Sequence, residues 1–173
     1  SILAFAAITI GFVFIHYPGT SLLMALLITA LVGTAMGLVN GIIVTRFNVH
    51  SIIVTLGTLS LYRGLVFIVS GGRQIDRNDI PVHIISFSQT SFLFSIPAIL
   101  ILSVIIVLIT HLIMRHSVLG REIYATGSNP EAAHLKGINV TKVTLFCFGV
   151  CGMLAGVAGL FYASRFGYVN PGV

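Results

Sequence analysis

The chain has 173 residues, of which 57% are hydrophobic and 8% are charged, and its mean hydropathy is +1.08. About a quarter of the residues of a soluble domain carry charge, so this composition excludes a soluble globular protein. Nine Lys and Arg residues against four Asp and Glu residues give a net charge of +5. In a membrane protein such basic residues mark cytoplasmic loops, and we therefore expect no nucleic-acid partner.

Five apolar segments account for most of the chain. A helix needs about 20 apolar residues to cross a ~30 Å hydrocarbon core, and barrel strands would instead alternate in polarity over about ten residues. We predict an all-α, polytopic transmembrane helix bundle with about five spans. Because the chain lacks an initiator Met and ends without a polar tail, we expect residues 1–173 to be one transmembrane domain from a longer protein. The predicted spans are Ser1–Ile15, Ser21–Thr45, Ser51–Ser70, Phe92–Met114 and Val143–Ser164.

The positions of the basic residues predict the orientation of these spans. Basic residues in short loops face the cytoplasm. The connection between the last two spans holds four of the nine basic residues, and Arg46 follows the second span. Alternation then places residues 16–20 and 71–91 outside, with Arg165. The four basic residues of the long connection are Arg115, Arg121, Lys136 and Lys142.

Glycines recur at helical spacing in the second and fifth segments. Small residues let membrane helices approach closely, so we interpret these glycines as helix contacts rather than ligand groups. Asn40 lies on the glycine face of its helix, where it either bonds a neighbouring helix or lines a polar pathway. The glycines are Gly33, Gly37 and Gly41 in the second segment, and Gly149, Gly152, Gly156 and Gly159 in the fifth.

The third segment carries polar residues on one side. Thr55, Thr58, Tyr62 and Arg63 fall within an arc of about 140° on a helical wheel, which indicates that part of this helix avoids lipid. A mid-span guanidinium costs ~2.5 kcal/mol or more. Arg63 therefore lines a polar pathway, bonds buried groups or reaches the outer interface. With Asn40, these four residues are the candidate pathway residues.

The cytoplasmic connection contains a short helix with signals at both ends. Ser128 is predicted to cap it and Glu131 to complete a capping box, while Pro130 suits the first turn and Gly137 the stop. About eight residues, roughly 12 Å, lie between these signals.

This short helix is either an interfacial element, a docking knob for a soluble partner or a solvated linker. Its apolar residues are Ala132, Ala133 and Leu135. We favour docking, because alanines bury little area in lipid but permit a close fit into a protein groove.

The sequence lacks the motifs that are typical of catalysis, metal binding and ATP binding. No span contains Asp or Glu, which argues against a secondary transporter driven by an ion gradient. No His-Glu-x-x-His, Gly-x-Ser-x-Gly or phosphate-binding Gly-x-x-x-x-Gly-Lys motif occurs, so we expect no catalytic residue, no metal site and no ATP site in this chain. Cys147 and Cys151 are interpreted as packing residues.

Several blocks together resemble the sugar-type permeases of ATP-binding cassette importers, which serve ribose, xylose, arabinose and related cargo. Glu131-Ala132-Ala133 followed by Gly137 resembles the cytoplasmic loop of these permeases. The narrower block Leu61-Tyr62-Arg63-Gly64 is most similar to the autoinducer-2 permeases. The other matching blocks are Gly37-Leu38-Val39-Asn40-Gly41, Ile53 to Leu59, Ser70-Gly71-Gly72-Arg73 and Gly120 to Gly127.

The resemblance implies a permease subunit in a bacterial inner membrane. Its partners would be a second permease copy or paralogue, cytoplasmic ATPases that bind ATP and Mg²⁺, and a periplasmic substrate-binding protein, all around a lipid bilayer. A secondary transporter and a purely structural membrane subunit remain the alternatives. The resemblance implies an ATPase coupling contact at Glu131, Ala132, Ala133 and Gly137, and we add the apolar Leu135 of the same helix.

Overall fold

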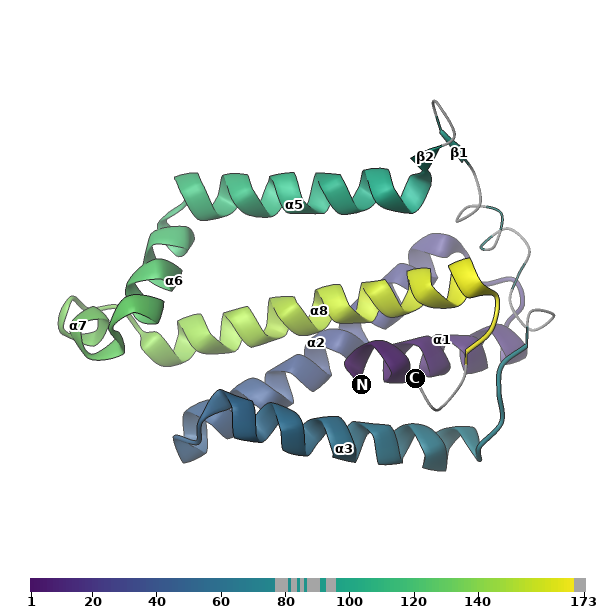
Figure 1. The fold of residues 1–173 in the computed structure, drawn as a ribbon, viewed down its shortest axis with the longest axis horizontal. Coiled ribbons are helices and arrows are strands. Elements are labelled where there is room, and N and C mark those ends of the chain that lie inside the picture. Colours follow the sequence, from purple (N-terminus) through teal and green to yellow (C-terminus); the bar gives the residue numbers. More distant parts are fainter. Residues whose placement is uncertain (77–80, 82–83, 85, 87–90, 93–95, 170–173) are drawn as a thin grey trace.

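The computed structural model describes residues 1–76, 81, 84, 86, 91–92 and 96–169. Its helices confirm the predicted all-α class, and the described strands are two residues long and pair antiparallel. Four described helices, α2, α3, α5 and α8, are long and apolar enough to cross a membrane, and α1 is a shorter apolar helix. The elements are α1 (Ile2–His16), α2 (Leu22–Phe47), α3 (Ser51–Ser70), β1 (Ser91–Phe92), β2 (Ile96–Pro97), α5 (Ala98–His116), α6 (Val118–Ser128), α7 (Pro130–Leu135) and α8 (Val140–Phe166) (Figure 1).

The first three helices keep their predicted bounds to within two residues, whereas α5 begins six residues later than predicted. Residue 96 precedes a proline, which disfavours the helical conformation and favours an extended one. Ile96 and Pro97 accordingly form β2, and the helix starts at Ala98. Helix α8 starts three residues earlier than predicted, because the Asn139 side chain accepts a hydrogen bond from the Lys142 N–H at 3.0 Å and caps it.

Helix α6 was not predicted. It occupies residues that the sequence assigned to a cytoplasmic connection, and its first turn is capped by Ser117, whose Oγ accepts a hydrogen bond from the Gly120 N–H at 2.9 Å. Figure 1 shows α6 turning across the ends of α5 and α8. It is therefore a connector at the edge of the bundle rather than a span.

The loops of the bundle gather at two opposite ends, as alternating spans require. Figure 1 places the α2–α3 turn, α6 and α7 at one end, and the α1–α2 turn, the strand pair and the last turn of α8 at the other. The first group contains the basic connection and the last turn of α2, with Arg46. The side of the membrane that each end faces stays a prediction, and after that prediction we call them the cytoplasmic end and the outer end.

Helices α2 and α8 pack backbone against backbone. A methyl group added at Gly152 would contact the Gly33 carbonyl oxygen and lie 2.8 Å from the Gly37 Cα. One added at Gly156 would lie 3.1 Å from the Gly33 Cα. Only hydrogen fits at these positions, which is the reason for glycine at this spacing. We call this contact the glycine seam.

The other predicted packing glycines flank the seam. A methyl group at Gly41 would lie 3.0 Å from the Cβ of Phe148, and one at Gly149 would lie 3.3 Å from a Leu38 methyl group. Gly159 continues the row toward α1, where an added methyl group would lie 3.2 Å from the Ala7 N atom.

The main core lies toward the outer end, between α1, α2, α3 and α8. The segment after α3 joins it through a bridge in which Ile75 and Val169 exchange two backbone hydrogen bonds of 3.1 and 3.0 Å. This bridge ties the end of α8 to the chain that leaves α3. The buried members of the core are Ala7, Ile8, Ile10, Phe14, Ala25, Val66, Ile75, Ile84, Leu160, Ala163 and Val169.

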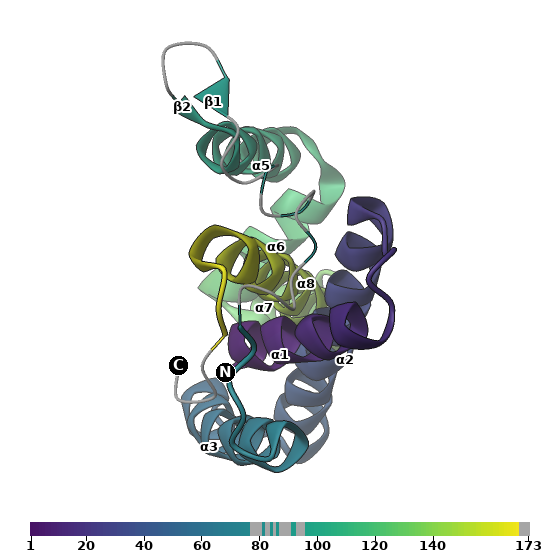
Figure 2. The same ribbon diagram turned by 90° about the vertical axis from the view of Figure 1, so that its right-hand side faces the viewer.

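Helix α5 stands apart from this core. Figures 1 and 2 both show it separated from the other membrane-length helices, and none of its described residues is buried. Its principal contacts are with α6 and β2, at its two ends. The bundle is therefore a packed group of four helices with α5 attached beside it.

Candidate functional site

Helix α7 is a six-residue helix that begins at Pro130 and is capped by Asn129. The Asn129 Oδ1 atom accepts hydrogen bonds from the Glu131 and Ala132 N–H groups, both at 3.1 Å. The predicted capping box is therefore wrong, since Ser128 is the last residue of α6. Asn129 takes the cap because it precedes a proline, which favours the extended backbone that an N-cap needs.

The end of α7 is followed by a left-handed glycine. Gly137 has φ +83°, a conformation that side-chain-bearing residues avoid, and its N–H donates to the His134 carbonyl at 2.9 Å. The Ile138 N–H donates to the Ala133 carbonyl at 3.1 Å. These bonds satisfy carbonyls that the helix end leaves unpaired, and the chain turns directly into α8.

The predicted contact residues of α7 face different ways. Ala133 is 2% exposed and packs inside the protein, whereas Leu135 is 87% exposed. Glu131 and Ala132 are also exposed. A shallow hollow of about 470 Å³ lies beside them, lined by Pro130, Glu131, His134, Leu135 and Val140. Helix α7 thus presents an exposed leucine and a carboxylate at the cytoplasmic end.

Replacing Asn129 with alanine should loosen α7. Loss of a side-chain N-cap costs about 1 kcal/mol, which corresponds to roughly fivefold faster local opening. We expect faster hydrogen exchange at the Glu131 and Ala132 amides, measured by mass spectrometry of the full-length protein. Ser128→Ala is the matched control and should leave exchange unchanged. Equal effects of the two variants would contradict the assignment of the cap.

A second hollow lies between α6 and the start of α8. It has a volume of about 490 Å³ and carries one acidic and one basic side chain, those of Glu122 and Lys142. Its other lining residues are Leu119, Ile123, Gly137, Asn139, Val143 and Phe146. The first hollow thus involves α7 itself, and the second reaches Gly137 in the turn that follows α7.

The candidate pathway residues divide into two groups. Thr58 and Tyr62 lie on the buried face of α3, and Asn40 is buried on α2. The Tyr62 hydroxyl donates to the Met36 carbonyl at 3.0 Å and to the Asn40 Oδ1 atom at 3.2 Å. This interaction joins α2 to α3. Tyr62 lies 26 positions after Met36 and 22 positions after Asn40, so no local sequence pattern predicts the contact.

Thr55 and Arg63 lie on the exposed flank of α3. The Thr55 hydroxyl donates to the Ile52 carbonyl of its own helix at 3.1 Å. Arg63 lines a small hollow of about 160 Å³ with Ser1, Ala4, Leu59 and Val66, between α3 and the start of α1. Of the candidate pathway residues, these two therefore have side chains exposed on the surface of the described chain.

Replacing Tyr62 with phenylalanine should weaken the α2–α3 contact. Hydrogen bonds between membrane helices contribute about 0.6 kcal/mol on average and up to about 1.7 kcal/mol. We expect a decrease of that size in the free energy of unfolding, measured by denaturant titration in detergent. Tyr124→Phe, at an exposed position, is the control. In a cycle with Asn40→Leu the two effects should be less than additive, and full additivity would contradict a shared bond.

The two cysteines and the acidic groups form no larger cluster among the described residues. Cys147 and Cys151 are free thiols on α8. In the part of the chain that the structure describes, no group of three His, Cys, Asp or Glu side chains is placed to hold a metal ion.

Comparisons with known proteins extend over the whole chain. Residues 1–173 match the family model described as the permease component of a branched-chain amino acid transport system. The autoinducer 2 import system permease protein LsrC of Yersinia pseudotuberculosis (strain YPIII) is 36% identical over 169 residues, which are 98% of this chain and 47% of that protein. The same-named proteins of Yersinia enterocolitica and Yersinia pestis (strain Pestoides F) are also 36% identical over 98% of this chain, covering 46% and 47% of their lengths.

The chain spans about half the length of these curated relatives. No solved structure matches it at a significant level.

Proposed function

This chain belongs to the family of permease components of branched-chain amino acid transport systems, and from that premise we propose that it is part of the membrane-spanning subunit of an ATP-binding cassette importer. Four apolar helices of membrane-crossing length support this proposal. In it, a separate cytoplasmic ATPase binds ATP and Mg²⁺ and hydrolyses the nucleotide. The chain itself supplies the solute path and the contact with that ATPase, and no catalytic residue.

The observation that carries the proposal is the position of α7. This helix is capped at its start, stopped by Gly137 and held at the cytoplasmic end with Leu135 87% exposed. A soluble partner that covers Leu135 would remove its apolar side chain from water, which is favourable, while Glu131 can stay at the polar rim of such a contact. We propose that Glu131, Ala132 and Leu135 touch the ATPase, while the buried Ala133 and the turn at Gly137 fix the shape of the contact.

The contact can transmit movement because α7 is joined closely to the packed helices. Three residues after Gly137, α8 begins, and its backbone packs directly against that of α2 along the glycine seam. Well-packed helices move as units rather than deform continuously. A displacement of α7 by the ATPase would therefore shift α8 and α2 together and alter the solute path.

For the cargo we propose a small polar solute of the sugar-like, autoinducer-2 class. The support is the name of the relatives, which are autoinducer 2 import permeases. The accessible Thr55 and Arg63 on α3 are the proposed pathway groups. Tyr62 bonds Asn40 and so holds that helix against α2, and Thr58 is buried on the same face as Tyr62. A second permease copy or paralogue would complete the path, and a periplasmic binding protein would deliver the solute.

The proposal is tested by purification of the full-length protein from its own membranes in mild detergent, followed by mass spectrometry of the proteins that accompany it. We expect an ATPase with a nucleotide-binding motif, recovered in amounts comparable to the permease. Recovery of the chain alone, repeated after chemical cross-linking, would contradict the importer proposal and favour a secondary transporter. If an ATPase is recovered, the solute held by any periplasmic binding protein that accompanies the permease would identify the cargo.

A further inference from the structure

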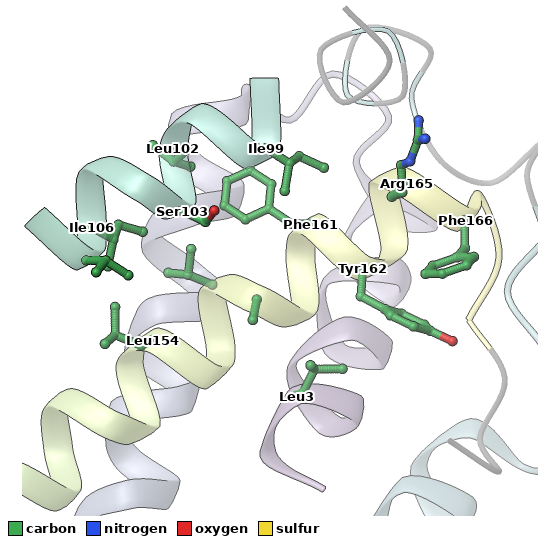
Figure 3. Close-up of a pocket in the computed structure, with 13 residues that line it drawn as sticks. Leu3, Ile99, Leu102, Ser103, Ile106, Leu154, Phe161, Tyr162, Arg165 and Phe166 are labelled. Carbon is green, nitrogen blue, oxygen red and sulfur yellow. The ribbon is translucent and has the colours of Figure 1, made fainter. Parts of the chain in front are cut away.

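An apolar groove runs between α5 and α8 on the side where α5 stands apart. Its volume is about 510 Å³. Figure 3 shows Phe161 reaching from α8 toward Ile99 and Ser103 on α5, with Arg165 at one end of the groove. The remaining lining residues are apolar apart from the Tyr162 hydroxyl.

The chemistry of the walls excludes a polar solute along most of the groove. The Ser103 hydroxyl donates to the Leu100 carbonyl of its own helix at 2.8 Å, so it offers no free donor. Between Leu154 and Phe161 the α8 wall consists of apolar side chains. The other polar groups of the lining belong to Tyr162 and Arg165, near the outer end. Such a surface is favourable for a hydrocarbon chain and unfavourable for a sugar.

The length of the groove matches one leaflet of a membrane. The α8 wall extends from Leu154 to Phe166, which at 1.5 Å per residue is about 18 Å, slightly more than half of a ~30 Å hydrocarbon core. Arg165 lies in the last turn of α8, at the outer end. Its guanidinium makes no ion pair with any residue that the structure describes. An apolar channel of one leaflet's depth therefore ends at a cation that is level with the lipid headgroups.

The groove has room for a hydrocarbon chain. Its volume is about 510 Å³ and its walls are mostly apolar. An extended hydrocarbon chain is much thinner than a helix, which is about 10 Å wide with its side chains, so the chain needs little of the space between α5 and α8. From these observations we propose that the groove binds one acyl chain of an anionic phospholipid of the outer leaflet, with the lipid phosphate on Arg165.

Tyr162 supports the same placement. Aromatic side chains with a polar tip are enriched at the membrane–water interface, and the Tyr162 ring lies 4.6 Å from that of Phe166 in the last turn of α8. The bound chain fills the space between α5 and α8 and holds α5 against the bundle. Phosphate on the guanidinium gives a charge-assisted bond. A zwitterionic headgroup carries the same phosphate, but its ammonium group adds a like charge near the guanidinium, which makes an anionic headgroup the better fit.

The test places a photoreactive benzophenone side chain at Ser103 of the full-length protein. The protein is reconstituted in vesicles of phosphatidylethanolamine with about one-fifth phosphatidylglycerol and irradiated. Adducts are then identified by mass spectrometry of the irradiated protein that remains monodisperse in detergent. We expect phospholipid adducts in which phosphatidylglycerol is enriched at least threefold over its share of the vesicle. A second probe at Ile106, on the same wall, should give the same result.

Variants at the groove's end separate a specific site from bulk lipid. Arg165→Gln should remove the enrichment and Arg165→Lys should retain most of it. Arg115→Gln removes a cation from the opposite end of α5 and should change nothing. Ala158→Phe fills the groove and should lower the yield of lipid adducts. Adducts to another polypeptide segment would overturn the proposal. It would also be overturned if wild type and Arg165→Gln both gave phosphatidylglycerol adducts only in proportion to the share of that lipid in the vesicle.

Discussion

Replacing Gly152 with valine should prevent assembly of the helix bundle. Any side chain at this position would contact the Gly33 carbonyl oxygen and lie 2.8 Å from the Gly37 Cα. Overpacking costs about 1–3 kcal/mol even where flexible side chains give way, and helix backbone atoms cannot rotate aside. The helices must then separate and lose the whole glycine seam. We expect at least tenfold less monodisperse protein after extraction in mild detergent.

Glycines of α3 provide the matched controls. Side chains added at Gly57 and Gly64 would meet nothing within 4 Å in the described structure. Gly57→Val and Gly64→Val change helix propensity and hydropathy as Gly152→Val does, but they do not touch the seam. Their yield should stay within about twofold of wild type. Equal losses in all three variants would show that helix propensity, rather than the α2–α8 contact, is responsible.

Replacing Leu135 with aspartate should abolish transport while leaving the permease intact. This side chain is 87% exposed, so folding does not depend on it. In the proposed contact it enters a groove of the ATPase, where buried anchors cost about 2 kcal/mol or more when removed and an unpaired carboxylate costs further. We expect at least a tenfold loss of solute uptake and of ATPase recovered with the permease, at unchanged permease yield.

Two further variants show whether α7 makes the coupling contact. Tyr124→Asp introduces the same charge at an exposed position of α6, 63% accessible, and should have little effect. Gly137→Leu places a side chain at φ +83°, which costs about 1–2 kcal/mol and distorts the end of α7. If Leu135→Asp and Gly137→Leu, tested as separate variants, both transported normally, the coupling assignment would be refuted.

The sequence predicted the spans well because apolar runs and membrane thickness are local properties. The helices α1, α2 and α3 begin and end within two residues of their predicted bounds. Glycine spacing likewise predicted which faces of α2 and α8 lie in the contact, since helical periodicity alone selects them. The family resemblance rested on motifs in the same order along the chain, and the family match covers residues 1–173.

The errors lie where two local signals compete or where distant residues meet. Ser128 and Asn129 are both good caps, and the choice depends on how far α6 continues and on the proline at position 130. The signal that could have found the cap is the Asn-Pro pair itself. The division of the polar residues of α3 between a buried and an exposed flank depends on where α2 lies, through the bond from Tyr62 to Met36 and Asn40. A helical wheel contains no information about that neighbour.

The glycine seam also limits how related permeases can be recombined. Gly33 and Gly37 on α2 fit against Gly152 and Gly156 on α8, more than a hundred positions later in the chain. A crossover between two relatives placed anywhere from α3 to α7 would take these surfaces from different parents. Chimaeras that exchange α2 and α8 together should therefore survive far more often than single-crossover chimaeras, whatever cargo the parents carry.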